Sequence, residues 1–213
     1  MATRLLLSAV GFLACCRTPP VHSSETPAAP IARPRDDVVA IVMGREITTH
    51  DLDSDSLDSL ILHPLFQSYR QEKQIVATQG EIETCINAFR SMQDAESRDP
   101  NSPFRDAERS PDEDLEREMA ENWVIGWKTS RQMYQDYGGT VIWQQANPLE
   151  PVGAYLAFLR EKELMGVFRI YDADRNVEFW RYFTRDHGAW VVPPERVDYS
   201  VPWWETVVKQ GIK

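Results

Sequence analysis

Residues 38–52 read VVAIVMGREITTHDL, and this stretch carries the signals for both a strand and a helix start. The run Val38–Met43 is rich in β-branched residues, is closed by Gly44, and is too short for a stable helix. Thr48, with Asp51 three residues later, has the form of a helix N-cap. We therefore expect one short buried strand that leads directly into helical structure.

Two helices are expected next along the chain. Apolar residues recur at helical spacing over residues 57–69, where Pro64 is expected to kink the helix or mark its boundary. Thr78 and Glu81 have the spacing of a capping box, and the same period continues over residues 82–92. These patterns predict two helices separated by a polar turn.

A third, longer helix is expected after a polar loop. Residues 110–113, Ser-Pro-Asp-Glu, place a Ser N-cap before a Pro at the first helical position, and Gly138 ends the apolar stripe that follows. A further helix is expected to begin at Asn147-Pro148 or at Glu150-Pro151 and to stop at Gly166.

The remaining pattern completes a mostly α fold. Apolar residues at 177–183 indicate a last helix, and residues 141–145 indicate a second short strand. We expect this strand to pair with residues 38–43, which gives a helical domain over residues 37–192 with a short two-stranded β element. Residues 193–213 are expected to form a tail rich in Pro and aromatic residues.

The N-terminus has the features of an export signal. The uncharged apolar run Leu5–Ala14 has the length of a secretory signal and is too short to span a bilayer. The residues before Cys15 resemble the bacterial lipobox, which implies removal of residues 1–14, lipidation of Cys15 and anchoring on the periplasmic side of a bacterial envelope. Cleavage after Ser23, as in an ordinary signal peptide, is the alternative. If Cys15 is the anchor, residues 15–36, which are rich in Pro, are expected to form a tether.

Charge and cysteine content exclude several classes of protein. Asp and Glu number 33 against 23 Lys and Arg, so a main role in nucleic-acid binding is disfavoured. The segment Glu96–Glu118 supplies about half of the net charge of −10. It is either a docking strip for basic partners or a solvated loop. Cys85 is expected to be a small buried hydrophobe, and no structural disulfide is expected.

The stretch Val38–Asp51, together with the helix start at Thr78 and Glu81, resembles the N-terminal domain of the SurA-type periplasmic chaperones, in the trigger factor/SurA peptide-binding superfamily. The resemblance covers residues 37–93 and implies a strand followed by helices that hold unfolded or extended polypeptide. Larger members carry a parvulin-type isomerase domain with paired histidines, which has no counterpart here. The resemblance thus implies the peptide-holding part of a foldase without its isomerase.

Catalytic and metal-binding motifs are not found in the sequence. It contains no Gly-x-Ser-x-Gly elbow, no His-Glu-x-x-His and no phosphate-cradling Gly-rich loop, so no catalytic residue, cofactor or metal is expected. Residues 172–178 resemble the opening of a calcium loop, but Val177 and Phe183 stand where Gly and Glu are required. We expect Asp172 or Asp174 to cap a helix instead.

Aromatic residues are the remaining candidates for function. The aromatic residues that recur at helical spacing are expected to be buried in the core. Trp190, Trp203 and Trp204 lie in the Pro-rich end of the chain, where they are either buried by a tail that wraps back or exposed as peptide-binding residues. The leading hypothesis is a non-catalytic holder of unfolded polypeptide. The alternatives are an envelope lipoprotein that docks to one folded partner and a diverged prolyl isomerase.

The export signal generates a first prediction. Cells that express the native chain should incorporate a radioactive fatty acid into it, because the lipid is attached through the Cys15 thiol, and Cys15→Ala should lose the label. Cys16→Ala serves as the matched control and should keep it. Equal labelling of the native chain and Cys15→Ala would exclude Cys15 as the anchor.

Overall fold

A small antiparallel sheet opens the fold, in a computed structural model that describes residues 37–98, 112–145 and 148–210. Strand β1 (Val38–Val42) lies between β2 (Arg45–Thr48) and β3 (Phe168–Ile170). Ile41 of β1 is paired in register with Glu46 of β2 and with Arg169 of β3. Met43 and Gly44 form the two-residue turn from β1 to β2, with φ of 49° and 81°. Positive φ at both turn residues matches the right-handed twist of a hairpin.

The expected pairing of the first strand is wrong. Residues 141–145 do not pair with β1; within them Ile142 forms isolated antiparallel bridges with Glu150 and Val191. The actual partners are the segment that follows the turn and a three-residue strand more than 120 residues away. Because β3 is so short, its residues carry no strand pattern of their own, so local periodicity could not identify it. The mostly α fold with a short β element is confirmed.

The first two long helices begin where side chains satisfy their free backbone N–H groups. In α1 (Leu57–Glu72), the side chain of Ser56 accepts a hydrogen bond from the N–H of Ser59. Pro64 lies inside α1, so of the two alternatives, a kink or a boundary, the boundary is wrong. For α2 (Gln79–Arg98), the predicted capping box is confirmed, because Thr78 N–H donates to Glu81 at 2.8 Å and Glu81 N–H donates to Thr78 Oγ1 at 3.3 Å.

The third helix, α3 (Glu113–Tyr137), runs for 25 residues. Asp112 is its N-cap and accepts from the N–H of Leu115 at 3.0 Å, while the expected cap Ser110 lies outside the described residues. Gly138 ends the helix, as predicted. The acidic loop within Glu96–Glu118 falls mostly on residues 99–111, which also lie outside the described ranges.

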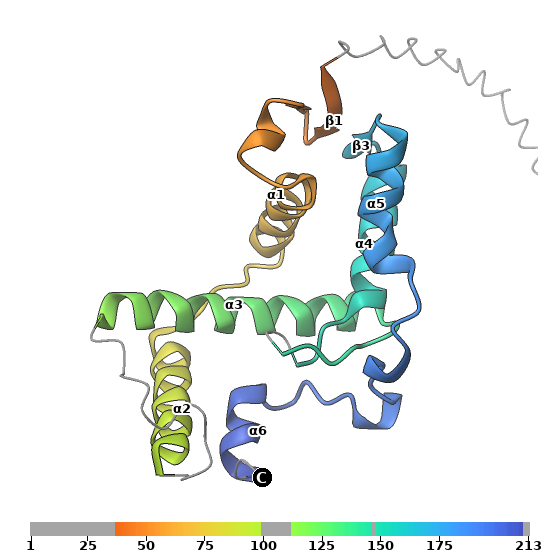
Figure 1. Ribbon diagram of the computed structural model, residues 1–213. Helices are drawn as coiled ribbons and strands as arrows, with labels where there is room; N and C mark the ends of the chain where they lie inside the picture. The colour runs from red at the N-terminus through yellow and green to blue at the C-terminus, as the bar shows by residue number, and fades with distance from the viewer. Residues whose placement is uncertain (1–36, 99–111, 146–147, 211–213) are drawn as a thin grey trace, which may run out of the picture. The chain divides into compact units, whose positions relative to one another are not determined.

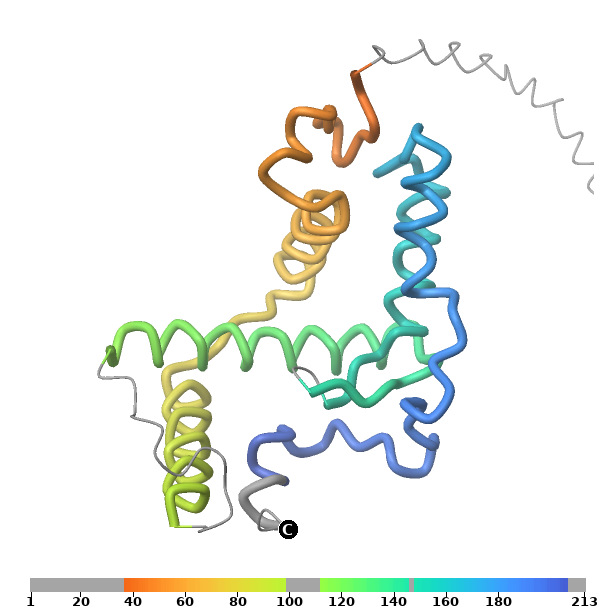
Figure 2. Tube along the Cα trace, in the orientation of Figure 1, coloured from red at the N-terminus to blue at the C-terminus, as the bar shows by residue number. Residues whose placement is uncertain are grey.

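Three more helices complete the described chain. The helices α4 (Val152–Leu164) and α5 (Ala173–Thr184) pack side by side, as Figure 1 shows. Single 3-10 turns lie at Asp51–Asp53, Gly188–Trp190 and Pro194–Arg196. The last helix, α6 (Trp203–Gln210), was not expected from the sequence; the chain returns to it from α5 and packs it against α2 (Figure 2).

Two hydrophobic cores share α3. The first core gathers the sheet, α1, α4, α5 and Met133 near the C-terminal end of α3. The second core joins α2 and α6 to the N-terminal half of α3, through Val124 and Trp127. Cys85 belongs to the second core and is fully buried, and burial raises the pKa of its thiol to about 12, so it packs as a neutral hydrophobe, as expected.

The close approach at the start of α4 generates a second prediction. Gly153 N–H donates to Thr140 O at 2.9 Å, and a Cβ on Gly153 would lie 2.3 Å from Thr140 N. We expect Gly153→Ala to lower the free energy of unfolding by about 2–3 kcal/mol through overpacking. The control is Gly126→Ala inside α3, where a Cβ meets nothing within 4 Å.

Gly126→Ala should raise the free energy of unfolding by about 0.5–1 kcal/mol, because glycine disfavours a helix interior. Urea unfolding followed by circular dichroism measures both variants. Equal midpoints for Gly153→Ala and the native chain would show that the approach of α4 to residue 140 is not rigid.

Candidate polypeptide-binding surfaces

Two exposed indole rings form a stacked pair on the surface. The rings of Trp143 and Trp190 lie with centroids 5.6 Å apart and planes inclined by 15°. Their side chains are 47% and 58% exposed, although large aromatic residues usually bury most of their surface. Trp190 of this pair also lines a surface hollow.

The backbone holds this tryptophan pair in place. Trp143 N–H donates to Trp190 O at 2.7 Å, and Val192 N–H donates to Val141 O at 2.8 Å. The backbone of Ile142, between Val141 and Trp143, also exchanges two hydrogen bonds with the backbone of Glu150, at 2.8 and 3.0 Å. The segment 141–143 is therefore tied to two other segments of chain, and the pair is ordered before any ligand arrives.

A chain of hydrogen-bonded polar groups, buried at Glu150 and half-buried at Tyr182 and His187, lies in the same region. Tyr182 donates its hydroxyl proton to Glu150 at 2.7 Å, and Nε2 of His187 donates to the carbonyl oxygen of Tyr182 at 3.0 Å. Burial raises the pKa of the Glu150 carboxyl above 4.5, while the hydrogen bond from Tyr182 and the nearby His187 act in the opposite direction. Burial, together with the bond to Glu150, also raises the pKa of Tyr182.

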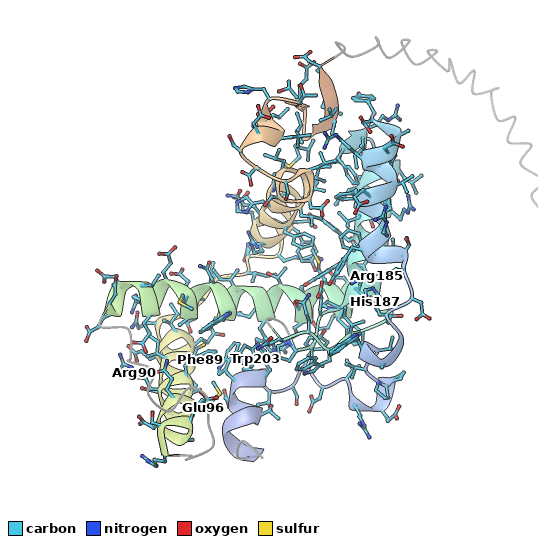
Figure 3. The ribbon with its side chains drawn as sticks, in the orientation of Figure 1. Phe89, Arg90, Glu96, Arg185, His187 and Trp203 are labelled. Atoms are coloured by element: carbon cyan, nitrogen blue, oxygen red, sulfur yellow. The ribbon has the colours of Figure 1, made fainter. Side chains whose placement is uncertain are left out.

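A hollow of about 350 Å³ borders the tryptophan pair and is lined by residues 185–190. Arg185 lies over the ring of Tyr182, with 5.3 Å between its guanidinium carbon and the ring centroid. Asp186 accepts from the N–H of Gly188 at 2.8 Å, which shapes the turn. Figure 3 labels Arg185 and His187 beyond the end of α5. The hollow thus combines an indole face with an exposed cation and backbone polar groups.

A second aromatic cluster lies between α2, α3 and α6. Phe89 stacks on Trp123 with ring centroids 3.9 Å apart, and Trp203 meets Phe89 edge-on at 5.6 Å (Figure 3). Trp204 is 2% exposed and packs against Trp127. Two hollows border this cluster, of about 440 Å³ at the start of α2 and about 150 Å³ between α1, α3, α4 and α6.

The three tryptophans singled out in the sequence therefore lie in different surroundings. Trp190 is exposed, Trp203 is half-buried and Trp204 is buried in the second core. The end of the chain folds back over α2, which buries Trp204 and part of Trp203. Cys15, the expected lipidation site, lies outside the described residues. Sequence reasoning missed Trp143 as the stacking partner of Trp190, because only the bridge between Ile142 and Val191 brings the two together.

Other candidate sites have structural roles. Asp172 caps α5 by accepting from the N–H of Arg175 at 2.9 Å, as expected from the incomplete calcium pattern. Within residues 37–98, 112–145 and 148–210, no three His, Cys, Asp or Glu side chains come together as a metal site. In the same ranges, no helix is long and apolar enough to cross a membrane.

Comparison of the chain with protein-family models, with curated proteins and with solved structures gave no match.

The buried Glu150 generates a third prediction, on pH dependence. Its pKa is higher in the folded than in the unfolded chain, so the unfolded state loses its proton first as the pH rises above 4.5. Glu150 therefore reduces stability progressively above that pH. We expect Glu150→Gln to be more stable than the native chain at pH 7, with a difference that vanishes below pH 4.5.

Unfolding midpoints measured between pH 4 and pH 8 test this expectation. The matched control is Glu195→Gln, which changes an exposed carboxylate outside this polar chain. A difference between Glu150→Gln and the native chain that is constant with pH would contradict the raised pKa.

Proposed function

We propose that this protein holds extended or unfolded polypeptide on the periplasmic side of a bacterial envelope and catalyses no reaction. The observation that carries the proposal is the exposed, backbone-fixed stack of Trp143 and Trp190 beside a hollow of about 350 Å³. In this proposal, Cys15 anchors the chain to the membrane through lipid, and residues 15–36 tether the folded part.

The tryptophan pair suits a ligand that lacks a fixed shape. Indole rings offer a large apolar contact area, and each ring is ordered by only two side-chain torsions. Because the rings of Trp143 and Trp190 are already stacked, a bound segment does not have to bear the entropy cost of ordering them. Aromatic side chains are also the commonest anchors of binding energy at protein interfaces.

The neighbouring hollow would receive the side chains that alternate along an extended segment. Its lining includes the guanidinium of Arg185 and the indole of Trp190, so it would accept both acidic and apolar side chains. Breadth of this kind is expected of a holder of many clients rather than of an enzyme site. The buried hydrogen bonds of Glu150 and Tyr182 keep the wall of the hollow fixed.

The resemblance to SurA-type chaperones supports the same function. It rests on the strand, the sequence pattern at Thr48 and Asp51 and the helix start at Thr78, and it implies a polypeptide-holding domain. Asp51 accepts from both the N–H and the hydroxyl of Thr48, at 2.8 and 2.7 Å, but Thr48 ends β2 and His50 is the N-cap of the 3-10 turn that follows, so the expected helix N-cap at Thr48 is wrong. These hydrogen bonds hold the pKa of Asp51 below its ordinary value.

A fourth prediction tests the tryptophan pair. Trp190→Ala and Trp143→Ala should each raise the Kd for a fluorescent, aromatic-rich peptide about tenfold, the loss of about 1.4 kcal/mol that is typical of an aromatic anchor. The double variant should lose less than the product of the two effects, because the rings contact each other. Fluorescence anisotropy measures the affinities.

Leu164→Ala is the control, since Leu164 is 87% exposed and lies outside the pair. It should leave the Kd unchanged. A native chain that neither binds aromatic-rich peptides nor suppresses aggregation of a diluted, denatured client would contradict the proposal. Recovery of one stoichiometric folded partner from envelope extracts, in place of a broad set of clients, would favour an adaptor instead.

A further inference from the structure

The hollow of about 150 Å³ shares no lining residue with the hollow beside the tryptophan pair and is bordered by four helices. Phe66 and Arg70 come from α1, Gly126 from α3, Tyr155 from α4 and Trp203 from α6. A cavity of that volume accepts a group of about the size of benzene. The hollow therefore has room for one large side chain, and its lining supplies several aromatic rings and a single cation.

Arg70 is the unusual member of this lining. It is half-buried, and burial lowers the pKa of its guanidinium. Among the described residues, no acidic group opposes that effect. Arg70 forms no ion pair with any carboxylate of the described residues. Lys73, three residues further on, does form an ion pair, with 2.8 Å between its ammonium and the carboxylate of Asp136.

A position in the last turn of α1 explains why a cation is tolerated there, since the helix dipole favours positive charge at a C-terminus. It does not explain why the guanidinium borders a hollow in which the described residues supply no counter-ion. Arginine stays charged even when partly desolvated, and its planar fork matches the two oxygens of a carboxylate. A carboxylate in the hollow would complete this site.

The floor of the hollow leaves space for such a ligand. Gly126 stands in the interior of α3, where glycine costs about 1 kcal/mol relative to Ala, and a Cβ there would meet nothing within 4 Å. Beside it, the hydroxyls of Ser130 and Tyr155 lie 2.8 Å apart, buried between α3 and α4. The helix backbone is thus uncovered where an apolar group would enter.

We propose that this hollow binds the free C-terminal carboxylate of a polypeptide whose last residue is aromatic or large and aliphatic. Arg70 pairs with the α-carboxylate, while Phe66 and Trp203 contact the last side chain. This inference rests on the proposed function, since it assigns the hollow to recognition of a client's end and the tryptophan pair to its extended part.

The test uses two fluorescent ten-residue peptides that end in Phe, identical except that one has a free C-terminal acid and the other an amide. The native chain should bind the acid about tenfold more tightly than the amide, as expected for a charge-assisted pair. Arg70→Met should remove this preference and leave the amide's Kd unchanged. Arg169→Met, which removes an exposed arginine of β3, should keep the preference.

A second variant keeps the proposal testable if Arg70→Met unfolds. Gly126→Leu places a side chain in the hollow without altering charge, and it should also abolish the preference for the acid; urea unfolding checks that each variant is folded. Equal affinity for acid and amide in the native chain would overturn the C-terminal site while leaving polypeptide holding intact. Binding of neither peptide would overturn both proposals.

Discussion

The burial of one face of α3 from Ala120 to Met133 is the constraint on which the rest of the structure depends. A helix of 25 residues is about 37 Å long, and α3 contributes side chains to both cores along it. Its N-terminal half buries Val124 and Trp127 against α2 and α6, and its C-terminal half buries Met133 beside the sheet. Each fully buried side chain of this kind stabilises the fold by about 1.5–3 kcal/mol. The single helix α3 therefore packs into both cores.

The hollow beside Arg70 follows from that arrangement. Trp127 faces the second core, whereas Ser130 is bonded to Tyr155 of α4, so α3 changes its packing partners within a single turn. At such a change, neither set of neighbours fills the space over the helix, and Gly126 adds no side chain to it. The surface pair Trp143–Trp190 has a different origin, since it depends on backbone pairing between loops beyond the two cores.

Features set by residues a few positions apart could be predicted from the sequence, and those set by distant contacts could not. Thr78 and Glu81 satisfy each other's backbone groups across one turn, so the pattern alone locates the start of α2. One of the two partners of β1 is a three-residue strand more than 120 residues further along the chain. Trp190 could be singled out as an aromatic residue outside any helical period, but its stacking on Trp143 depends on tertiary structure, as does the lack of an ion pair between Arg70 and the carboxylates that the structure describes.

The charge of the whole chain limits how Arg70 can act. A net charge of −10 gives a field that repels acidic peptides, so long-range attraction would not draw a carboxylate to this site. At physiological ionic strength, however, charges are screened beyond about 8 Å, and partly buried groups are screened least. Selectivity at Arg70 must therefore come from contact: a guanidinium already partly stripped of water gains more from one carboxylate at hydrogen-bond distance than it loses to acids far away on the surface.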